Sequence, residues 1–227
     1  MIVSFASSKG GVGKSTTCAA IGARLAARGE QVLIIDLDQN KTLDRWGRKA
    51  KLPGLTVLSS DRDGFTTLFR ETVGAGTMDH ILIDLAGARE ATALKAIARS
   101  DLVVIPAQAS EPDLREALVV ASDVRDVSEE RGVAIPYRML LTKMSPLRTR
   151  VTDFVYQELA RHKLPIFRTV LVERVAYREM FLTGTPPSAG DRSGAGAEVA
   201  ALTTEMEEIV NEARAGAGTQ RAGGQVL

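Results

Sequence analysis

The chain alternates short apolar runs with longer amphipathic stretches. Each apolar run has the length and the composition of a β-strand. The runs lie at 1–7, 31–38, 55–59, 80–86, 102–107, 137–143 and 167–171. Several are apolar at consecutive positions, which is typical of strands buried on both faces of a parallel sheet.

Helices are predicted between these strands. A helix over 14–28 ends at Gly29, and a helix over 111–131 follows the cap residue Ser110 and stops at Gly132. The alternation of strands and helices predicts an α/β fold. We expect a doubly wound, mostly parallel sheet that is flanked by helices on both faces.

The last predicted helix covers about 195–213 and should dock on the sheet. Its apolar stripe has helical spacing and comprises Val199, Leu202, Met206 and Ile209. Its polar face is acidic and comprises Glu205, Glu207, Glu208 and Glu212. The glycine- and alanine-rich stretch 214–227 predicts a disordered tail, so we expect one domain over 1–213.

Composition excludes several classes of protein. The chain has 227 residues, of which 44% are apolar and 25% charged, and its net charge is +1. Its one cysteine, Cys18, gives neither a disulfide framework nor a cysteine-pair metal site. The sequence contains no apolar run long enough to span a bilayer and no leader pattern, so it predicts a cytoplasmic protein without a membrane partner.

The stretch "SSKGGVGKSTT" after the first strand has the form of a phosphate-binding loop. Gly13, Lys14 and Ser15 match the end of the pattern G-x-x-x-x-G-K-[ST], although Ser8 stands at its first glycine position. The strand, the glycine-rich loop and the helix follow one another in the order that such a site requires. A helix N-terminus and inward-facing backbone N–H groups favour a bound anion.

The loop residues predict an ATP site with Mg²⁺. We expect the backbone of Gly10, Gly11, Val12 and Gly13 to surround the phosphates. Lys14 should reach the β- and γ-phosphates, whereas Ser15 should bind Mg²⁺ with Thr16 beside it.

Carboxylates follow two of the predicted strands. Asp36 and Asp38 end the strand "VLIIDLD", and Asp84 ends "ILIDLA" in the manner of a Walker B aspartate. The carboxyl ends of parallel strands share one edge of a sheet, so all three should face the phosphate site. Gly87 should let the following loop sense a γ-phosphate.

The segment "KGGVGKST" resembles the deviant Walker A motif of the ParA/MinD family of ATPases, which is marked by an extra lysine, here Lys9. "DLDQN", "ILIDLAG", "FRTVLVERVAYREM" and "DRSGAGAEVAAL" are similar to further segments of that family. Gln39 stands where proline is usual, and the D-x-P after the Walker B strand is missing. The resemblance covers about 1–212 and is closest to small ParF-like plasmid partition ATPases.

The resemblance implies an ATP-dependent homodimer in which two subunits enclose two ATP molecules. Lys9 of one subunit would then reach the nucleotide of the other, and Asp38 would orient the attacking water. Asp36 and Asp84 match positions around Mg²⁺.

The adenine contacts are harder to assign. Thr142 and Lys143 match a family position near the adenine, and Pro106 with the loop toward Asp113 is a further candidate.

Charge layout indicates nonspecific DNA as a partner. The segment from Arg138 to Glu179 contains nine lysines and arginines but four acidic residues. This excess of positive charge favours contacts with DNA phosphates, which do not depend on the base sequence. The individual candidates are Arg168, Arg174 and Arg192. Family resemblance adds a ParB-like or other centromere-binding adaptor and a nucleoid-associated location, and it implies a role in plasmid or chromosome partition.

Other functions of similar proteins stay open. Relatives of this type position a protein cluster or assist conjugative DNA transfer, and a metabolic P-loop enzyme is a third alternative. The tail carries only Arg214 and Arg221 and has no apolar face, which argues against the membrane helix of MinD proteins.

Overall fold

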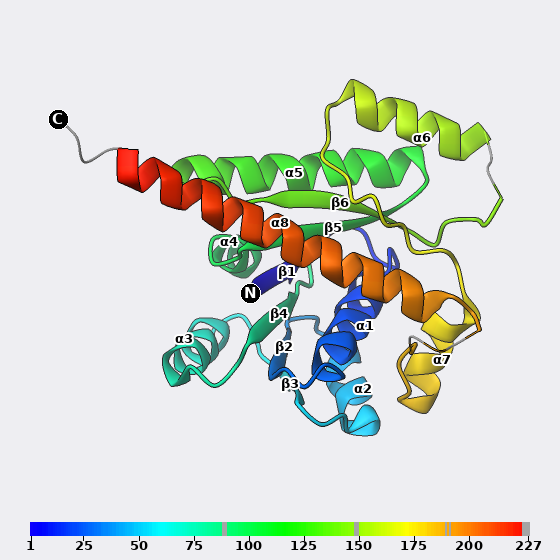
Figure 1. Cartoon of the computed structure of the whole chain (residues 1–227), viewed down its shortest axis with the longest axis horizontal. Helices are drawn as coiled ribbons and strands as arrows, with labels where there is room; N and C mark the ends of the chain where they lie inside the picture. The colour runs from blue at the N-terminus through cyan, green and yellow to red at the C-terminus, as the bar shows by residue number, and fades with distance from the viewer. Residues whose placement is uncertain (88–89, 148–149, 189, 191, 224–227) are drawn as a thin grey trace.

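Six parallel strands form one sheet in the order β3-β2-β4-β1-β5-β6 (Figure 1). The computed structural model describes residues 1–87, 90–147, 150–188, 190 and 192–223. The strands are β1 (Ile2–Phe5), β2 (Val32–Asp36), β3 (Leu55–Ser59), β4 (His80–Asp84), β5 (Leu102–Gln108) and β6 (Tyr137–Thr142). The predicted doubly wound α/β class is therefore confirmed.

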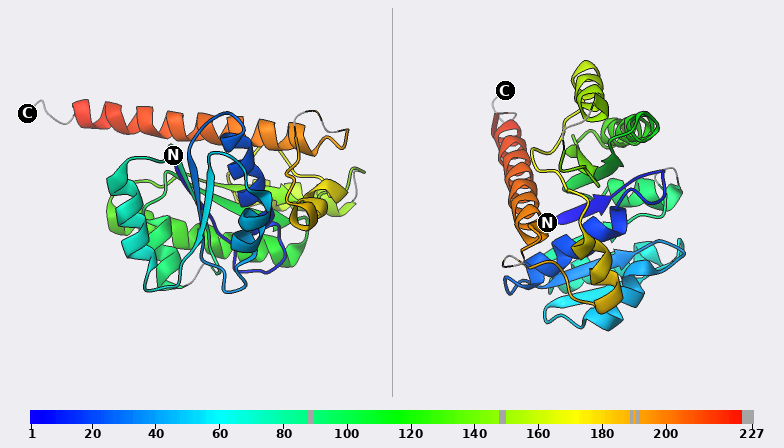
Figure 2. Two further views of the ribbon diagram at one scale, coloured as in Figure 1. Left: turned by 90° about the horizontal axis from the view of Figure 1, so that it is seen from below. Right: turned by 90° about the vertical axis from the view of Figure 1, so that its right-hand side faces the viewer.

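Helices connect the strands and cover both faces of the sheet (Figure 2). They are α1 (Lys14–Ala26), α2 (Thr42–Ala50), α3 (Phe65–Ala75), α4 (Ala91–Ile97), α5 (Glu111–Arg131), α6 (Arg150–Arg161), α7 (Val175–Thr183) and α8 (Ala195–Gly223). The side chain of Ser110 accepts a hydrogen bond from the backbone N–H of Asp113, which confirms the predicted cap of α5.

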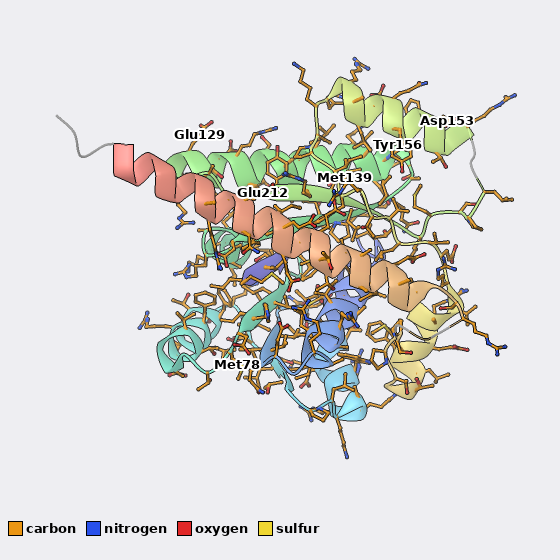
Figure 3. The ribbon with its side chains drawn as sticks, viewed as in Figure 1. Met78, Glu129, Met139, Asp153, Tyr156 and Glu212 are labelled. Atoms are coloured by element: carbon orange, nitrogen blue, oxygen red, sulfur yellow. The ribbon has the colours of Figure 1, made fainter. Side chains whose placement is uncertain are left out.

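Two separate apolar cores lie on opposite faces of the sheet. Alternate strand residues enter opposite cores, as Ile34 and Ile35 do, because successive side chains of a strand point to opposite faces. Helices α1, α2, α7 and α8 cover one core, while α3, α4, α5 and α6 cover the other. Figure 3 shows Asp153 and Tyr156 on α6, which packs next to α5.

The strand register aligns the functional ends of the sheet. Asp84 at the end of β4 lies opposite both Phe5 of β1 and Asp36 of β2. Because these three strands end level with one another, the loops that follow them share one edge.

The segment 167–171, predicted as a strand, lies beside β6 without forming a regular strand. The N–H groups of Phe167 and Leu171 donate to the carbonyl oxygens of Met139 and Leu141, both at 2.9 Å. The N–H groups of Arg168 and Thr169 instead donate to the carboxylate of Glu205, at 2.7 and 3.0 Å. Glu205 is therefore buried rather than part of a solvated acidic face.

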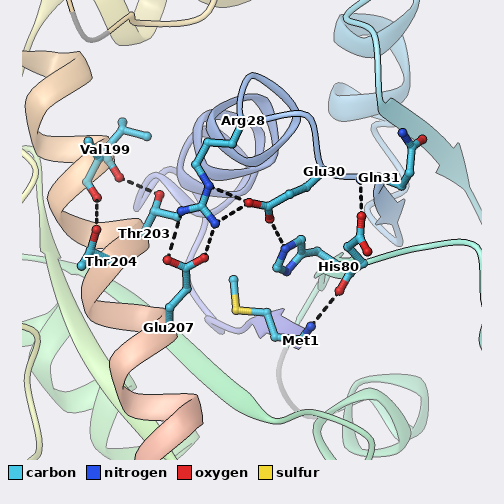
Figure 4. Close-up of polar contacts among 11 residues, drawn as sticks. Met1, Arg28, Glu30, Gln31, His80, Val199, Thr203, Thr204 and Glu207 are labelled. Carbon is cyan, nitrogen blue, oxygen red and sulfur yellow. Dashed lines mark hydrogen bonds and ion pairs between the residues drawn. The ribbon is translucent and has the colours of Figure 1, made fainter.

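Helix α8 lies along the sheet and crosses α1 (Figures 1 and 2). Arg28, after α1, forms a two-pronged ion pair with Glu207 of α8 and also contacts Glu30 (Figure 4). The helix continues to Gly223, into the stretch for which the sequence predicts a disordered tail.

The predicted tail and the predicted domain boundary are not fully covered by the structure. Residues 224–227 lie outside the described part of the chain, and the single domain over 1–213 stays a prediction. Within the described part, the structure contains no helix with the length and apolarity needed to cross a bilayer.

Candidate functional site

The glycine-rich loop joins β1 to α1 in the conformation that an anion site needs. Gly11 and Gly13 have φ of 77° and 88°, values that side-chain-bearing residues rarely adopt. Gly13 directly precedes α1, so the loop leads into the helix N-terminus. Residues of the loop and of the helix start line one cavity, and the N-terminus of a helix favours a bound anion.

This phosphate cavity has a volume of about 650 Å³ and opens at the carboxyl edge of the sheet. The described residues that line it include Gly10, Gly11, Gly13, Lys14, Ser15, Thr16, Asp38, Glu90 and Lys143. The structure therefore brings the predicted loop, Asp38 and Lys143 together, while Lys9 is not among these lining residues.

Asp84 and the start of α1 form the polar base of the site. The Ser15 hydroxyl donates to Asp84 Oδ2 at 2.6 Å, and Lys14 Nζ lies 4.0 Å from Asp84 Oδ1. Burial raises the pKa of Asp84 to about 6, against the opposing effects of Lys14 and the Ser15 hydrogen bond. Asp84 Oδ1 has no hydrogen-bond partner among the residues that the structure describes.

These groups fit Mg²⁺. The ion prefers hard oxygen ligands and is commonly held by one or two carboxylates together with substrate phosphates and water. Ser15 and Asp84 Oδ1, which accepts no hydrogen bond from the described residues, supply such ligands. No cluster of three or more His, Cys, Asp or Glu side chains suited to a metal occurs in the described part of the chain.

Asp36 has a different environment from the one that we expected. Its fully buried carboxylate accepts N–H groups from Asp38, Leu43 and Asp44 at 3.0, 2.9 and 3.1 Å. Burial raises its pKa, although these hydrogen bonds oppose the shift. Asp36 thus ties the loop after β2 to α2, and its oxygens face the backbone rather than an open metal position.

Asp38 is the carboxylate of this loop that lines the phosphate cavity. It is half-buried, and its Oδ1 accepts the N–H of Asn40 at 2.8 Å. The two aspartates therefore differ in environment: Asp36 is the last residue of β2 and is buried, whereas Asp38 lies in the loop beyond the strand and lines the cavity.

Lys9 pairs with Asp113 near the start of α5. The Lys9 side chain is 42% exposed, whereas that of Asp113 is 1% exposed. Asp113 also accepts the N–H of Gln108 at 3.0 Å, and Gln108 Nε2 donates to the carbonyl oxygen of Gly11 at 3.2 Å. The two lysines of the loop thus have separate partners, Asp84 for Lys14 and Asp113 for Lys9.

A second cavity of about 430 Å³ adjoins the first. The two cavities share Gly13, Thr16 and Lys143. The second has largely apolar walls from Leu171, Tyr177 and Phe181, and it also includes Thr142.

Two of the residues that we predicted beside the adenine lie in the walls of this apolar cavity. Thr142 and Lys143 line it, and the Thr142 hydroxyl donates to the carbonyl oxygen of Val12 at 2.7 Å. Pro106 and Asp113 are not among its described lining residues. Tyr177 and Phe181 also line this cavity and were not predicted from the sequence; Tyr177 lies within the family-like segment "FRTVLVERVAYREM", and Phe181 directly follows it.

The three candidate DNA-binding arginines have different surroundings. Arg168 pairs with Glu208 at 2.5 Å, and Arg174 pairs with Glu198 at 2.6 Å. Arg192 is exposed in the turn that precedes α8. Arg148, which contributes to the basic excess, lies outside the described residues. The predicted excess of charge is therefore partly neutralised by acidic residues of α8.

The fold and the loop define a P-loop nucleotide-binding protein of the ParA/MinD group. The structure is similar to that of the septum site-determining protein MinD from Pyrococcus horikoshii OT3 in complex with Mg-ADP, with a TM-score of 0.70, 18% identity and coverage of 93% and 98% of the two chains. It is also similar to an AMPPNP-bound protein of Borrelia burgdorferi described as a plasmid partition protein, with a TM-score of 0.67, 19% identity and coverage of 92% and 98%.

Sequence comparison identifies the family. Residues 1–186 match the family model described as VirC1 protein. Protein ParA of Rhizobium radiobacter is 31% identical over 190 residues, which cover 81% of this chain and 83% of that protein. Protein virC1 of the same organism is 28% identical over 184 residues, which cover 79% of each chain. The chain belongs to the VirC1 family, and the predicted ParA/MinD resemblance is confirmed.

Proposed function

We propose that this protein is a Mg²⁺-dependent ATPase that acts as an ATP-timed switch in DNA partition. One observation carries the proposal: the loop holds two lysines in separate environments. Lys14 lies in the phosphate cavity beside Asp84, whereas Lys9 lies outside that cavity at the surface of α5. A single bound triphosphate needs only the first lysine.

The phosphate cavity would take the triphosphate of ATP, and the adjoining apolar cavity would take the adenine. Gly10, Gly11, Val12 and Gly13 would direct backbone N–H groups to the phosphates, with Thr16 beside them. Thr142 and Lys143 would border the adenine. Bound Mg²⁺ would neutralise charge on the β- and γ-phosphates, held by Ser15 and Asp84. The solved relatives with AMPPNP and Mg-ADP support this choice of ligands.

Asp36 would act on this chemistry indirectly. Its three backbone hydrogen bonds fix the loop that carries Asp38. Asp38 would then orient the attacking water toward the γ-phosphorus, and the bond to the β–γ bridging oxygen breaks to release phosphate and ADP. Lys14 would stabilise the charge that develops on the transferred group.

Lys9 would complete the site of a second copy of the chain. In the free protomer its ammonium is paired with Asp113. In an ATP-bound homodimer it would leave Asp113 and approach the partner's phosphates, as an arginine finger does. Hydrolysis would remove that negative partner, and the dimer would separate.

The dimer would bind DNA through its phosphates without reading bases. Arg192 and Arg168 are both exposed, and Arg168 and Arg174 would contribute only after release from their glutamates. A centromere-binding adaptor of the ParB kind would stimulate hydrolysis. In this cycle the protein would act in the cytoplasm, on the nucleoid.

The test is retention of the protein on random-sequence DNA with ATP, ADP or no nucleotide across a salt series. Partition predicts retention that requires ATP and falls steeply with salt. A footprint on one specific sequence would favour conjugative DNA transfer instead. ATP turnover that depends on a small molecule, without DNA retention, would indicate a metabolic enzyme and contradict the proposal.

A further inference from the structure

One wall of the apolar cavity forms hydrogen bonds with a side chain of α8. Val172, Arg174 and Tyr177 belong to this wall. Glu198 of α8 contacts all three residues. Its Oε2 accepts the N–H of Val172 at 3.2 Å and the hydroxyl of Tyr177 at 3.0 Å. Its Oε1 accepts Nε and Nη2 of Arg174 at 2.8 and 2.6 Å.

The chain before α8 is shaped to admit this ion pair. Gly194 has φ of +80°, and a Cβ atom on it would lie 3.2 Å from Arg174 Nη2. A side chain at position 194 would therefore be strained and would also crowd the guanidinium. The side chains of Arg174 and Glu198 are 30% and 15% exposed, so the pair is largely removed from water.

A second glutamate of α8 makes a comparable contact at a different place. Glu205 is 6% exposed and accepts the N–H groups of Arg168 and Thr169. Both glutamates thus hold the extended segment that follows α6. Only Glu198 holds the part of the segment that lines the cavity, which makes Glu205 a matched control.

We propose that Glu198 is a positioning residue for the base of a purine nucleoside triphosphate. It acts through Val172, Arg174 and Tyr177, whose placement sets the width of the apolar cavity. A wall that is fixed before binding avoids the entropic cost of ordering it around the ligand. The inference rests on the proposed function, in which this cavity takes the base of ATP.

If Glu198 positions the base, its removal should affect binding of the base and not binding of the phosphates. Removal of the Glu198 carboxylate should weaken contacts to the base and leave contacts to the phosphates intact, because the glycine loop and Lys14 do not touch Glu198. A merely structural role would instead lower stability and weaken both sets of contacts together.

The experiment compares dissociation constants for ATP and for inorganic tripolyphosphate, each with Mg²⁺, in wild type, E198A, E198Q, E205A and E205Q. We expect E198A to reduce the preference for ATP over tripolyphosphate about tenfold, while tripolyphosphate affinity is unchanged. E198Q keeps one acceptor oxygen but loses the charge and replaces the other oxygen by a donor NH2 group, and it should reduce the preference about threefold. The Glu205 variants should unfold at lower temperature with an unchanged preference.

The outcomes separate this inference from the proposed function. A folded E198A protein with the wild-type preference would overturn the role of Glu198 and leave the ATP site intact. Equal loss of the preference in the Glu205 variants would also overturn it. Should E198A fail to fold, E198Q decides by the same criterion. Wild-type protein that binds ATP no better than tripolyphosphate would contradict the ATP site itself.

Discussion

Lys9 and Asp113 are 104 positions apart in the sequence and form an ion pair at the surface of the molecule. The pair links the phosphate loop to the start of α5. Asp113 is buried and also accepts the N–H of Gln108, so the carboxylate is fixed while the lysine side chain is half-exposed. Lys9 is thus the more accessible partner, and the proposed function requires a competing anion to displace it from Asp113.

Substitution of Lys9 by alanine should separate ATP binding from hydrolysis. We expect K9A to bind ATP with a dissociation constant within about threefold of wild type, because Lys9 does not line the phosphate cavity. Stimulated turnover should fall by about 1000-fold, the loss typical of a missing arginine finger. Filter binding and steady-state turnover with adaptor and DNA measure the two effects, and normal turnover by K9A would refute the role of Lys9 in trans.

Substitution of Asp113 by asparagine should ease dimerisation. The amide oxygen of the new side chain still accepts the N–H of Gln108, but the ion pair to Lys9 is lost. A partly exposed pair is worth little, so we expect the ATP-dependent dimer to assemble at about threefold lower protein concentration. Sedimentation velocity with a nonhydrolysed ATP analogue measures this. An unchanged or weaker dimer, at an unchanged melting temperature, would count against release of Lys9.

Asp36 and Asp38 should respond differently to alanine. D36A leaves three backbone N–H groups without their buried acceptor and should lower the free energy of unfolding by about 2–4 kcal/mol. D38A should keep the stability and the ATP affinity of wild type but abolish turnover, and the dimer should persist. Urea unfolding and turnover assays distinguish the two, and a D38A protein that hydrolyses ATP would remove Asp38 from the mechanism.

The buried carboxyl of Asp84 predicts a pH dependence of stability in the absence of nucleotide and Mg²⁺. Its pKa is raised from 3.8 to about 6, so folding favours the protonated form. The stability that it contributes is complete below pH 3.8 and is lost as pH rises to about 6. D84N removes this loss and should be more stable than wild type at pH 7, by up to about 3 kcal/mol.

Urea unfolding of wild type and D84N across pH 4–7 checks this prediction. The two stability curves should converge near pH 4 and separate toward pH 7. Parallel curves over that range would show that Asp84 does not titrate as its burial implies.

Arg192 should contribute to DNA retention more than a comparable surface arginine. R192E should weaken ATP-dependent retention and lower the magnitude of the salt slope by about 1, because one phosphate contact is lost. Arg70, exposed on α3, provides the control R70E. Equal effects of the two substitutions would indicate a general charge effect and exclude a DNA surface at Arg192.

Much of the fold could be read from local pattern. Six of the predicted apolar runs form the six strands of the sheet. Ser110 caps the start of α5 and Gly132 caps its end, as expected. The seventh run, 167–171, does not form a regular strand because two of its N–H groups donate hydrogen bonds to the carboxylate of Glu205 and not to a neighbouring strand. No local pattern reveals that exchange, since Glu205 is distant in sequence and looks like a member of a solvated acidic face.

By itself, the sequence determined the parallel α/β sheet, the phosphate loop and the approach of Asp38 and Asp84 to it. Apolar periodicity, glycine conformations and the shared edge of parallel strands are local or general properties, so they can be inferred without coordinates. Only the tertiary structure decided which carboxylate each cation meets: Lys9 pairs with Asp113, and Arg174 pairs with Glu198. Such pairings depend on burial and on contacts between distant elements, and these arise only when α5 and α8 pack against the sheet.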